Sequence, residues 1–325
     1  MSVSVFAPAS IGNVNVGFDV LGLAVKPVDG TLLGDVVTVT HSNDGDQLEV
    51  IGNFANKLPS DVKLNIVWDC LLLFNKELFA SKQTIAEVKI TLDKRMPVGS
   101  GLGSSACSVV AAIAGLNAFY EKYHQFSFSQ RALLKMMGQM EAKISGSLHY
   151  DNVAPCFLGG MQLMVPDPDI IARNLPQFED CYFVMAYPGI EVSTKAARDI
   201  LPTSYSRADL ISFGQNLATF VDACHRGDKV QAFSVLTDVV AEPYRKTILP
   251  GYSDAVSYLR QAGCLAVGIS GSGPTLFCVT DDAAKAEKFA HWLNNNYLQI
   301  SPSGASEGFV HICRADAQGA VSLPE

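Results

Sequence analysis

The sequence predicts an α+β protein of two domains. Stretches that alternate apolar and polar residues, as half-buried strands do, occur in both halves of the chain between segments of helical periodicity. Helices set against a mostly antiparallel sheet are typical of the α+β class. The length of 325 residues favours about two domains. A segment with three prolines, residues 164–178, is the predicted boundary, so the expected domains are residues 1–165 and 166–325.

The first half is predicted to alternate strands with loops before its first helix. The expected elements are strands at residues 3–7 and 34–40, a loop rich in glycine, asparagine and aspartate at residues 9–23, a helix at residues 65–79, and a strand from residue 88 in which Val88, Ile90 and Leu92 alternate with polar residues.

A glycine-rich loop follows this last strand and leads into an alanine-rich helix. Gly99, Gly101 and Gly103 are followed at once by Ser104 and Ser105. Glycines let backbone N–H groups curl around an anion, and the positive end of the helix points at the same place. We expect Ser104 or Ser105 to cap the helix and to offer a hydroxyl to a phosphate or a metal ion. The pattern predicts a phosphate-binding loop.

Neither common nucleotide motif fits this loop. No lysine follows Gly103, as a Walker motif would require, and Ser104 occupies the place of the third glycine of the dinucleotide fingerprint. Taken alone, the loop is equally consistent with a tight turn between a strand and a helix.

A second long helix is predicted from Ser129, a suitable N-cap, to about Ser145. Leu133, Met136, Met137, Met140 and Ile144 form its apolar face. On the flank of that face lies a glutamate, residue 141, whose carboxylate would be partly buried. By itself such a carboxylate is more typical of a surface ion pair.

The second half is predicted to contain four further helices, four strands and a short helix capped by Ser193 or Thr194. The expected elements are a strand at residues 181–188, the short helix carrying Arg198, helices at residues 210–225, 229–241 and 252–262, strands at residues 265–270 and 275–280, a helix through Trp292 and a last strand at residues 308–314.

Composition excludes several classes of function. The net charge of −8 and the absence of a basic run argue against a nucleic-acid or anionic-membrane partner. The 8 cysteines form no C-x-x-C pair, which predicts buried, reduced thiols in a cytoplasmic protein rather than disulfides or a zinc site. The first ten residues lack the basic and apolar regions of a signal peptide, and no apolar run is long enough to span a membrane.

Three motifs together resemble the GHMP small-molecule kinases. The second motif is the glycine loop, PVGSGLGSSA at residues 97–106, and the first and third are APASIGNVNVGFDVLG at 7–22 and GISGSGPTLF at 268–277. Residues 144–160, the EPYR sequence at 242–245 and the final GFVHICR are similar to the subgroup that phosphorylates homoserine. The resemblance extends from the first strand to the last.

The resemblance implies a fold, two cofactors and a nucleotide site. The fold would combine an N-terminal ribosomal-protein-S5-like ATP-binding domain with a C-terminal ferredoxin-like domain. The cofactors would be ATP and Mg²⁺, with the ion held by Glu141 together with Ser105 or Ser104, a set of hard oxygen ligands that suits it. The residues expected to contact ATP are Pro97, Val98, Gly99, Ser100, Gly101, Leu102, Gly103, Ser104, Ser105, Ala106, Cys107 and, near the adenine, Asn65.

The implied acceptor is L-homoserine, on the route to threonine. A zwitterionic amino acid needs a cationic fork for its carboxylate, and arginine matches that geometry. Arg198 and Arg245 match the family's carboxylate-binding positions, and Asp19 could accept from the ammonium group. The other expected substrate contacts are Asn13, His149, Asn152, Thr194 and Gly271. Glu141, Asn152 and Asp19 are the expected catalytic residues, and the pattern leaves open whether any residue acts as a general base.

Three other functions compete with this one. A kinase for another small alcohol, such as mevalonate, belongs to the same family. A regulator that binds ATP or a metabolite without catalysis would be expected to lack the metal carboxylate, yet Glu141 is present. A pyridine-nucleotide oxidoreductase is disfavoured by the missing third glycine. The resemblance also allows a homodimer.

Overall fold

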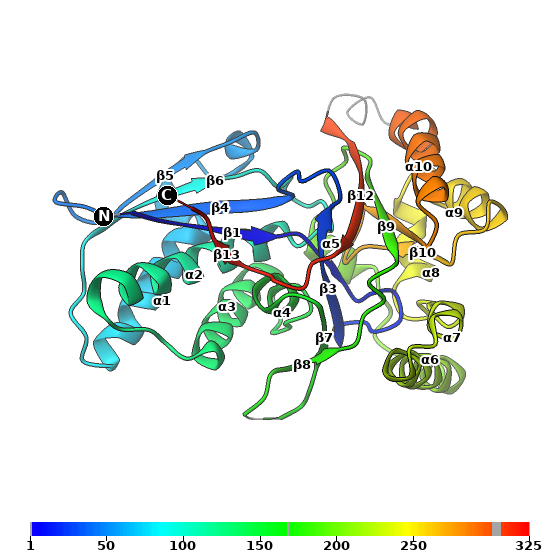
Figure 1. Cartoon of the computed structure of the whole chain (residues 1–325), viewed down its shortest axis with the longest axis horizontal. Helices are drawn as coiled ribbons and strands as arrows, with labels where there is room; N and C mark the ends of the chain where they lie inside the picture. Colours follow the sequence, from blue (N-terminus) through cyan, green and yellow to red (C-terminus); the bar gives the residue numbers. More distant parts are fainter. Residues whose placement is uncertain (1, 168, 301–306, 325) are drawn as a thin grey trace.

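The computed structural model describes residues 2–167, 169–300 and 307–324, and it confirms the α+β class. The described residues form two sheets that cross in the middle of the molecule, with helices packed on each (Figure 1). The short connecting 3₁₀ helices span Ala55–Lys57, Val62–Leu64, Lys246–Ile248 and Leu298–Ile300, and a π-helical turn spans Leu293–Tyr297.

The first sheet has five strands in the order β13-β1-β4-β6-β5 within the described residues. Alternating valines bury one face of β1 and β4, as predicted. The pairs are antiparallel except for β5 with β6. The strands are β1 (Ser2–Pro8), β4 (Gly34–His41), β5 (Gln47–Ile51), β6 (Val88–Asp93) and β13 (Val321–Ser322). Strands β5 and β13 were not predicted.

Four helices from the first half lie together beside this sheet (Figure 1). They are α1 (Ile66–Ala80), α2 (Ser104–His124), α3 (Gln130–Ser145) and α4 (Val153–Leu158). The side chain of Asn65 accepts from the N–H of Val67 to start α1, and Ser129 caps α3 as predicted. Small residues on α2 let it pack closely against β1 and β4, and the segment is buried along most of its length.

The second sheet joins strands from both halves of the chain. Its order is β10-β11-β9-β12-β3-β7-β8, with β2 paired to β3, and every pair is antiparallel. The strands are β2 (Ser10–Gly12), β3 (Leu21–Pro27), β7 (Met161–Met164), β8 (Ala172–Leu175), β9 (Tyr182–Tyr187), β10 (Ala266–Ile269), β11 (Leu276–Thr280) and β12 (Phe309–Ala315).

Strand pairing crosses the predicted boundary at residue 165 in both directions. Strand β3 pairs with β12, and β13 returns to pair with β1. Strand β8 occupies part of the proline-containing segment in which the boundary was predicted, because β7 offers it an antiparallel edge. The division into residues 1–165 and 166–325 stays a prediction.

The remaining helices come from the second half. They are α5 (Thr194–Asp199), α6 (Arg207–Arg226), α7 (Lys229–Ser234), α8 (Glu242–Arg245), α9 (Tyr252–Gln261) and α10 (Ala283–Trp292). The prediction of one helix over residues 229–241 is wrong beyond Ser234. The carboxylate of Asp238 accepts from the N–H groups of Val240, Ala241 and Glu242, which replaces helical bonds with a turn.

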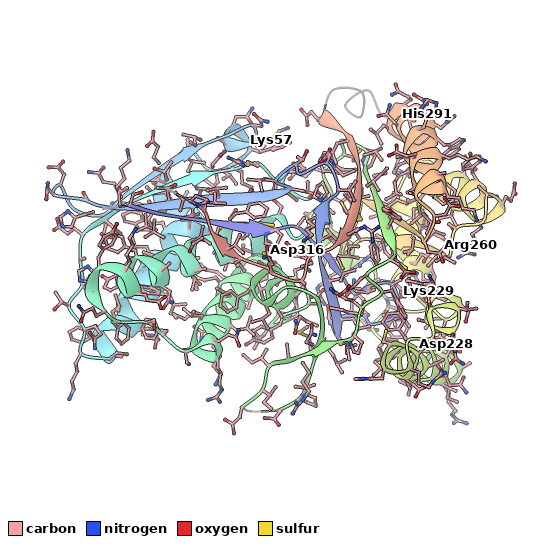
Figure 2. The ribbon with its side chains drawn as sticks, in the orientation of Figure 1. Lys57, Asp228, Lys229, Arg260, His291 and Asp316 are labelled. Carbon is pink, nitrogen blue, oxygen red and sulfur yellow. The ribbon has the colours of Figure 1, made fainter. Side chains whose placement is uncertain are left out.

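Ion pairs connect separate segments on the surface of the second half. Lys229, labelled in Figure 2 beside Asp228, begins α7 and contacts Asp180 at 2.5 Å and Asp281 at 2.7 Å. The hydrogen bonds that Lys229 donates to these two carboxylates raise its pKa. All eight cysteines are free, as expected. No helix within the described ranges is long and apolar enough to cross a membrane.

Candidate active site

A cavity of about 440 Å³ lies where the glycine loop, the end of α3, the loop before β3 and the start of α5 meet. This volume suits a small-molecule ligand. The cavity gathers most of the residues that the sequence singled out. Those lining it are Asn13, Asp19, Asn65, Val98, Gly99, Ser100, Gly101, Gly103, Ser104, Ser105, Glu141, His149, Asn152, Thr194, Arg198, Arg245 and Gly271.

The glycine loop has the backbone that its sequence predicts. Gly99, Gly101 and Gly103 all have positive φ, between 64° and 78°. A Cβ added at Gly101 would lie 2.5 Å from the carbonyl oxygen of Ser270 and 2.6 Å from that of Gly273. Glycine is therefore required at this position both for its φ and for the close approach of a second loop.

That second loop, between β10 and β11, holds the glycine loop by hydrogen bonds. The hydroxyl of Ser270 donates to the carbonyl of Gly101 at 2.7 Å, and the hydroxyl of Thr275 donates to that of Ser100, also at 2.7 Å. The first and third motifs meet there too, because the N–H of Gly271 donates to the carbonyl of Gly12. Residues more than 160 positions apart thus fix one loop conformation.

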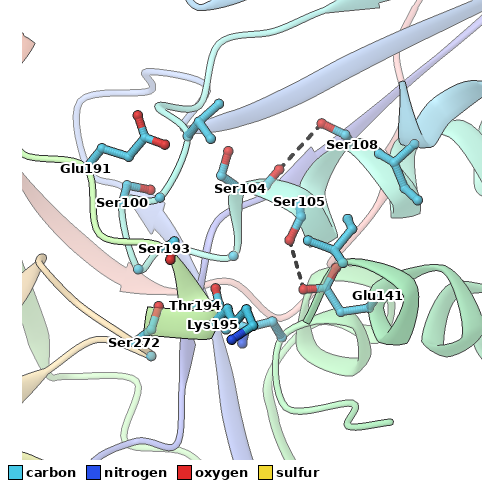
Figure 3. A pocket seen from close by; sticks show the side chains of 18 of the residues that line it. Ser100, Ser104, Ser105, Ser108, Glu141, Glu191, Ser193, Thr194, Lys195 and Ser272 are labelled. Carbon is cyan, nitrogen blue, oxygen red and sulfur yellow. Dashed lines mark hydrogen bonds between the residues drawn. The ribbon is translucent and has the colours of Figure 1, made fainter. Parts of the chain in front are cut away.

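The N-terminus of α2 opens into the cavity without a side-chain cap. The N-cap is Gly103, so the expectation that Ser104 or Ser105 caps the helix is wrong. The left-handed conformation of Gly103 leads directly into the first turn, and both serines are already helical. Their hydroxyls are used elsewhere: Ser104 donates to the carbonyl of Met96, and Ser105 donates to Glu141 at 2.8 Å (Figure 3). The first N–H groups of the helix are consequently left for an anion.

A buried ion pair stabilises the first turn of α2. The ammonium of Lys94 donates to Asp35 at 2.6 Å, to the carbonyl of Ser104 at 2.9 Å and to the hydroxyl of Ser108 at 3.0 Å. Asp35 also accepts from Ser108 and from the N–H groups of residues 95 and 96. Both charged side chains are at most 2% exposed. This network was not predicted, because a lysine that follows a strand normally lies on the surface.

The carboxylate of Glu141 is placed as a metal ligand would be. The residue is 6% exposed, Oε1 accepts from Ser105, and Oε2 is buried without a hydrogen-bond partner. Burial raises the pKa of this carboxyl group, and the hydrogen bond from Ser105 only partly opposes that rise. An unpartnered buried oxygen beside a serine hydroxyl fits a hard divalent cation such as Mg²⁺.

The acceptor side of the cavity begins with a strained turn. Asn13, Val14, Asn15 and Asp19 all have positive φ although none is glycine. The side chain of Asn13 stabilises the turn by accepting from the N–H of Asp19 at 2.9 Å and donating to the carbonyl of Gly271 at 3.3 Å. Strained backbone of this kind is concentrated at ligand sites.

Asp19 and Arg198 bind each other in this structure. The two guanidinium nitrogens Nη1 and Nη2 of Arg198 donate to the two carboxylate oxygens at 3.0 Å and 2.7 Å. The family resemblance assigns the two groups to opposite ends of a substrate, and their mutual pair was not predicted. The Nε of Arg198 is buried without a partner.

Arg245 lies near the same place but is held differently. Its Nε donates to the carbonyl of Ala197 at 3.1 Å and its Nη1 to that of Gly271 at 2.8 Å. The centre of the Phe18 ring lies 5.4 Å from the guanidinium of Arg245 and 5.5 Å from that of Arg198, so the two predicted arginines contact one aromatic ring. Burial lowers the pKa of Arg245, which is 3% exposed.

A chain of polar contacts connects this side to the glycine loop. His149 Nδ1 lies 2.8 Å from Asp151, the amide of Asn152 donates to Asp151 at 3.2 Å, and the hydroxyl of Ser10 donates to Asn152 at 3.0 Å. Burial lowers the pKa of His149, but the hydrogen bond and charge of Asp151 outweigh it, so the pKa is raised overall. A Cβ at Gly103 would lie 3.0 Å from the amide oxygen of Asn152.

Asn65 lines the same cavity. Its amide oxygen caps α1, and its Nδ2 is buried without a partner. Leu58, Pro59, Leu64 and Ile66 line the cavity near it in sequence. An apolar slot with one free donor suits a purine ring.

Four predicted contacts lie away from this cavity's lining: Pro97, Leu102, Ala106 and Cys107. Three of the four are buried in the hydrophobic core and do not face the cavity: Leu102, Ala106 and Cys107. Sequence reasoning missed Phe18, Lys94, Asp151, Glu191 and Lys195, which do line it. Asp151 was detectable from the sequence, because it lies two residues after His149 and directly before Asn152, and both of these were predicted contacts.

Comparison with known proteins agrees with this geometry. Residues 65–160 match the family described as "GHMP kinases N terminal domain", and residues 220–299 match "GHMP kinases C terminal". The homoserine kinase of Cytophaga hutchinsonii is 31% identical, with a TM-score of 0.86 over 99% of this chain and 97% of its own.

The chain belongs to the GHMP kinase family. It is therefore a small-molecule kinase, and the two-domain α+β fold that the motifs implied is confirmed. A putative homoserine kinase from Listeria monocytogenes shares the fold at 19% identity, with a TM-score of 0.66 over 99% of this chain and all of its own. Mevalonate kinase of L. major, solved with R-mevalonate, shares it at 14% identity and a TM-score of 0.68, over 96% of each chain.

Proposed function

We propose that this GHMP kinase transfers the γ-phosphoryl group of ATP to the hydroxyl of L-homoserine, forming ADP and O-phospho-L-homoserine. One observation carries the proposal: the pair Asp19–Arg198, together with Arg245, lies in the same cavity as the glycine loop and Glu141. Paired opposite charges suit a zwitterionic acceptor. The 31% identity to a homoserine kinase supports the same choice.

The nucleotide occupies the end of the cavity formed by the glycine loop. The adenine ring lies in the apolar slot with Asn65 Nδ2 as a donor, and the phosphates meet the N–H groups of the loop and of the first turn of α2. Glu141 and Ser105 would hold Mg²⁺, which would neutralise charge on the phosphates. Their only mutual bond uses Glu141 Oε1, leaving Oε2 for the ion.

The acceptor binds by replacing an internal ion pair. Its ammonium group takes a place at Asp19, and its carboxylate takes a place at Arg198 and Arg245. Because Asp19 and Arg198 compensate each other's charge, neither is an isolated charge before the acceptor binds. Thr194 and His149 line the cavity close to these groups in the fold and complete the acceptor end.

The transfer itself requires positioning more than covalent chemistry. The acceptor oxygen forms a bond to the γ-phosphorus, the bond from that phosphorus to the ADP oxygen breaks, and the hydroxyl proton passes to an oxygen of the transferred group. Asn152 orients the hydroxyl, because Ser10 and Asp151 fix its amide beside Gly103. Asp19 pairs with Arg198 in this structure and with the substrate ammonium group in the proposed complex, which makes it a poor general base in either state.

The test is ADP release measured by a coupled assay with homoserine, mevalonate, galactose or no acceptor. We expect turnover with homoserine to exceed that with the other two by orders of magnitude. Equal or greater turnover with mevalonate would overturn the acceptor while leaving the kinase assignment intact. A homoserine ester, which lacks the carboxylate charge, should bind weakly, and unchanged binding of the ester would argue against the zwitterion site.

A further inference from the structure

We propose that Lys195 binds the γ-phosphate of ATP and supplies the positive charge that a lysine supplies in a Walker loop. The inference rests on the proposed ATP-dependent transfer. It begins from an absence in the sequence: no lysine follows Gly103 in the glycine loop. Phosphoryl transfer spreads negative charge over the γ-phosphate oxygens, and cations beside those oxygens stabilise it.

The cavity offers few cationic side chains for this task. Among the described residues that line it, the lysines and arginines are Lys94, Lys195, Arg198 and Arg245. Lys94 is buried and donates to three fixed acceptors beneath α2. Arg198 is held by both oxygens of Asp19, and Arg245 donates to two backbone carbonyls at the acceptor end. These three are committed to other roles.

Within the part of the chain that the structure describes, the partner of Lys195 is an exchangeable one. Its ammonium group contacts Asp199, four residues along α5, at 2.6 Å, and the two side chains are 78% and 60% exposed. Exposed pairs of this spacing are only weakly stabilising. A phosphate carrying several charged oxygens can therefore displace Asp199 at little cost.

The backbone brings Lys195 to the mouth of the phosphate site. The N–H of Val192, three residues earlier, donates to the carbonyl of Gly99 at 3.0 Å. Ser193 then caps α5 by accepting from Ala196, which fixes the direction of the first turn. Figure 3 shows Lys195 beside Thr194 at the start of α5, in the cavity that Ser105 and Glu141 also line.

The experiment compares a non-hydrolysable ATP analogue with ADP, by calorimetry in the presence of MgCl₂ and without acceptor. For Lys195→Gln we expect the analogue to bind about 10–100-fold more weakly, the scale of one lost charged hydrogen bond. ADP, which lacks the γ-phosphate, should lose less than about threefold by the same reasoning. Lys195→Arg should recover part of the difference, because it restores the charge.

Two control variants separate this role from a structural one. Asp199→Asn removes the partner of Lys195 and should leave the preference for the analogue unchanged or increased. Lys143→Gln removes a lysine of α3 that is 58% exposed and pairs with Asp69, and it should change neither affinity. The proposal is overturned if Lys195→Gln weakens both nucleotides equally, or if Asp199→Asn reproduces its effect.

Failure of the proposed function would look different. If the wild-type protein prefers the analogue to ADP and loses that preference in Lys195→Gln, yet does not phosphorylate homoserine, then only the acceptor assignment fails. If the wild-type protein binds neither nucleotide, the ATP site and the role of Lys195 both fall.

Discussion

The two ends of the cavity are built in different ways. At the phosphate end, buried side chains hold backbone: Ser270 and Thr275 fix the glycine loop, and Lys94 with Asp35 supports the first turn of α2. At the acceptor end, charged side chains hold one another, as in the pair of Asp19 with Arg198.

The difference between the two ends explains how each of them would bind its ligand. The phosphate end presents N–H groups that are already fixed, so a nucleotide meets a site that needs little rearrangement. The acceptor end presents charges that are already compensated, so a ligand gains affinity only if it carries charges able to replace both partners. Substitutions at the phosphate end should therefore affect stability or nucleotide binding, and those at the acceptor end should affect selectivity.

The largest expected effect is on stability, from Lys94→Met. This change leaves Asp35 charged and buried without its cation, and breaking such a pair costs about 3–5 kcal/mol. Urea denaturation should show this loss in the free energy of unfolding. Lys89→Met is the matched control, because Lys89 pairs with Glu49 at 2.7 Å on the surface, where both are more than 40% exposed. The control should lose less than about 1 kcal/mol, and equal losses would refute the supporting role of Lys94.

The next largest effect is on catalysis, from Glu141→Gln. The amide keeps the shape but removes the charge that Mg²⁺ requires, so kcat should fall by roughly 10²–10³, the scale of one lost electrostatic group. Steady-state assays over a range of MgCl₂ concentrations measure this fall. Glu191→Gln alters an exposed carboxylate lining the same cavity and should retain most of the activity. Near-normal turnover of Glu141→Gln at saturating magnesium would exclude Glu141 as the metal carboxylate.

Local features of the fold were predictable because their signals are local. The caps Asn65 and Ser129, the alternating strands and the positive φ of Gly99, Gly101 and Gly103 all follow from residue type and spacing. The pairing of β13 with β1 could not be predicted, because a two-residue strand has no period and depends on an edge more than 300 residues away. Helix α7 is shorter than predicted because the carboxylate of Asp238 binds backbone N–H groups in a turn. Apolar periodicity does not reveal this competition between a side chain and helical hydrogen bonds.

The residues of the candidate site could be predicted from the sequence, but the contacts between their side chains could not. The motifs indicated Asp19, Arg198 and Glu141, yet motif matching says nothing about which of these side chains contact one another. The buried pair of Lys94 with Asp35 went unnoticed because a charged residue at a strand end normally faces solvent. Arg245 also combined two roles, since it supports the loop at Gly271 as well as facing the acceptor.

The alanine variants of Arg198 and Arg245 should differ in their effects on stability. Arg198→Ala removes a partly buried fork, so KM for homoserine should rise by roughly 10–100-fold, the effect of losing one charged hydrogen-bonded pair. KM for ATP should stay nearly constant. Arg245→Ala should raise KM for homoserine similarly but also lower the melting temperature, because the carbonyls of Ala197 and Gly271 lose a buried donor. If both variants weaken a homoserine ester as much as the free acid, neither arginine binds the carboxylate.

The smallest expected effect comes from Ser10→Ala, at the junction of the two ends. Ser10 is fully buried, and its hydroxyl donates to the amide oxygen of Asn152 without facing the acceptor end's charges. Losing this hydrogen bond costs about 0.5–1.5 kcal/mol, which corresponds to about 2–10-fold in kcat/KM for homoserine if Asn152 orients the acceptor hydroxyl. Ser10→Thr keeps the donor and should preserve more activity if the added methyl group fits. Because Ser10 also lies close to Gly103, binding of ADP is the control measurement: an equal loss of ADP affinity would show that Ser10 supports the glycine loop instead of Asn152.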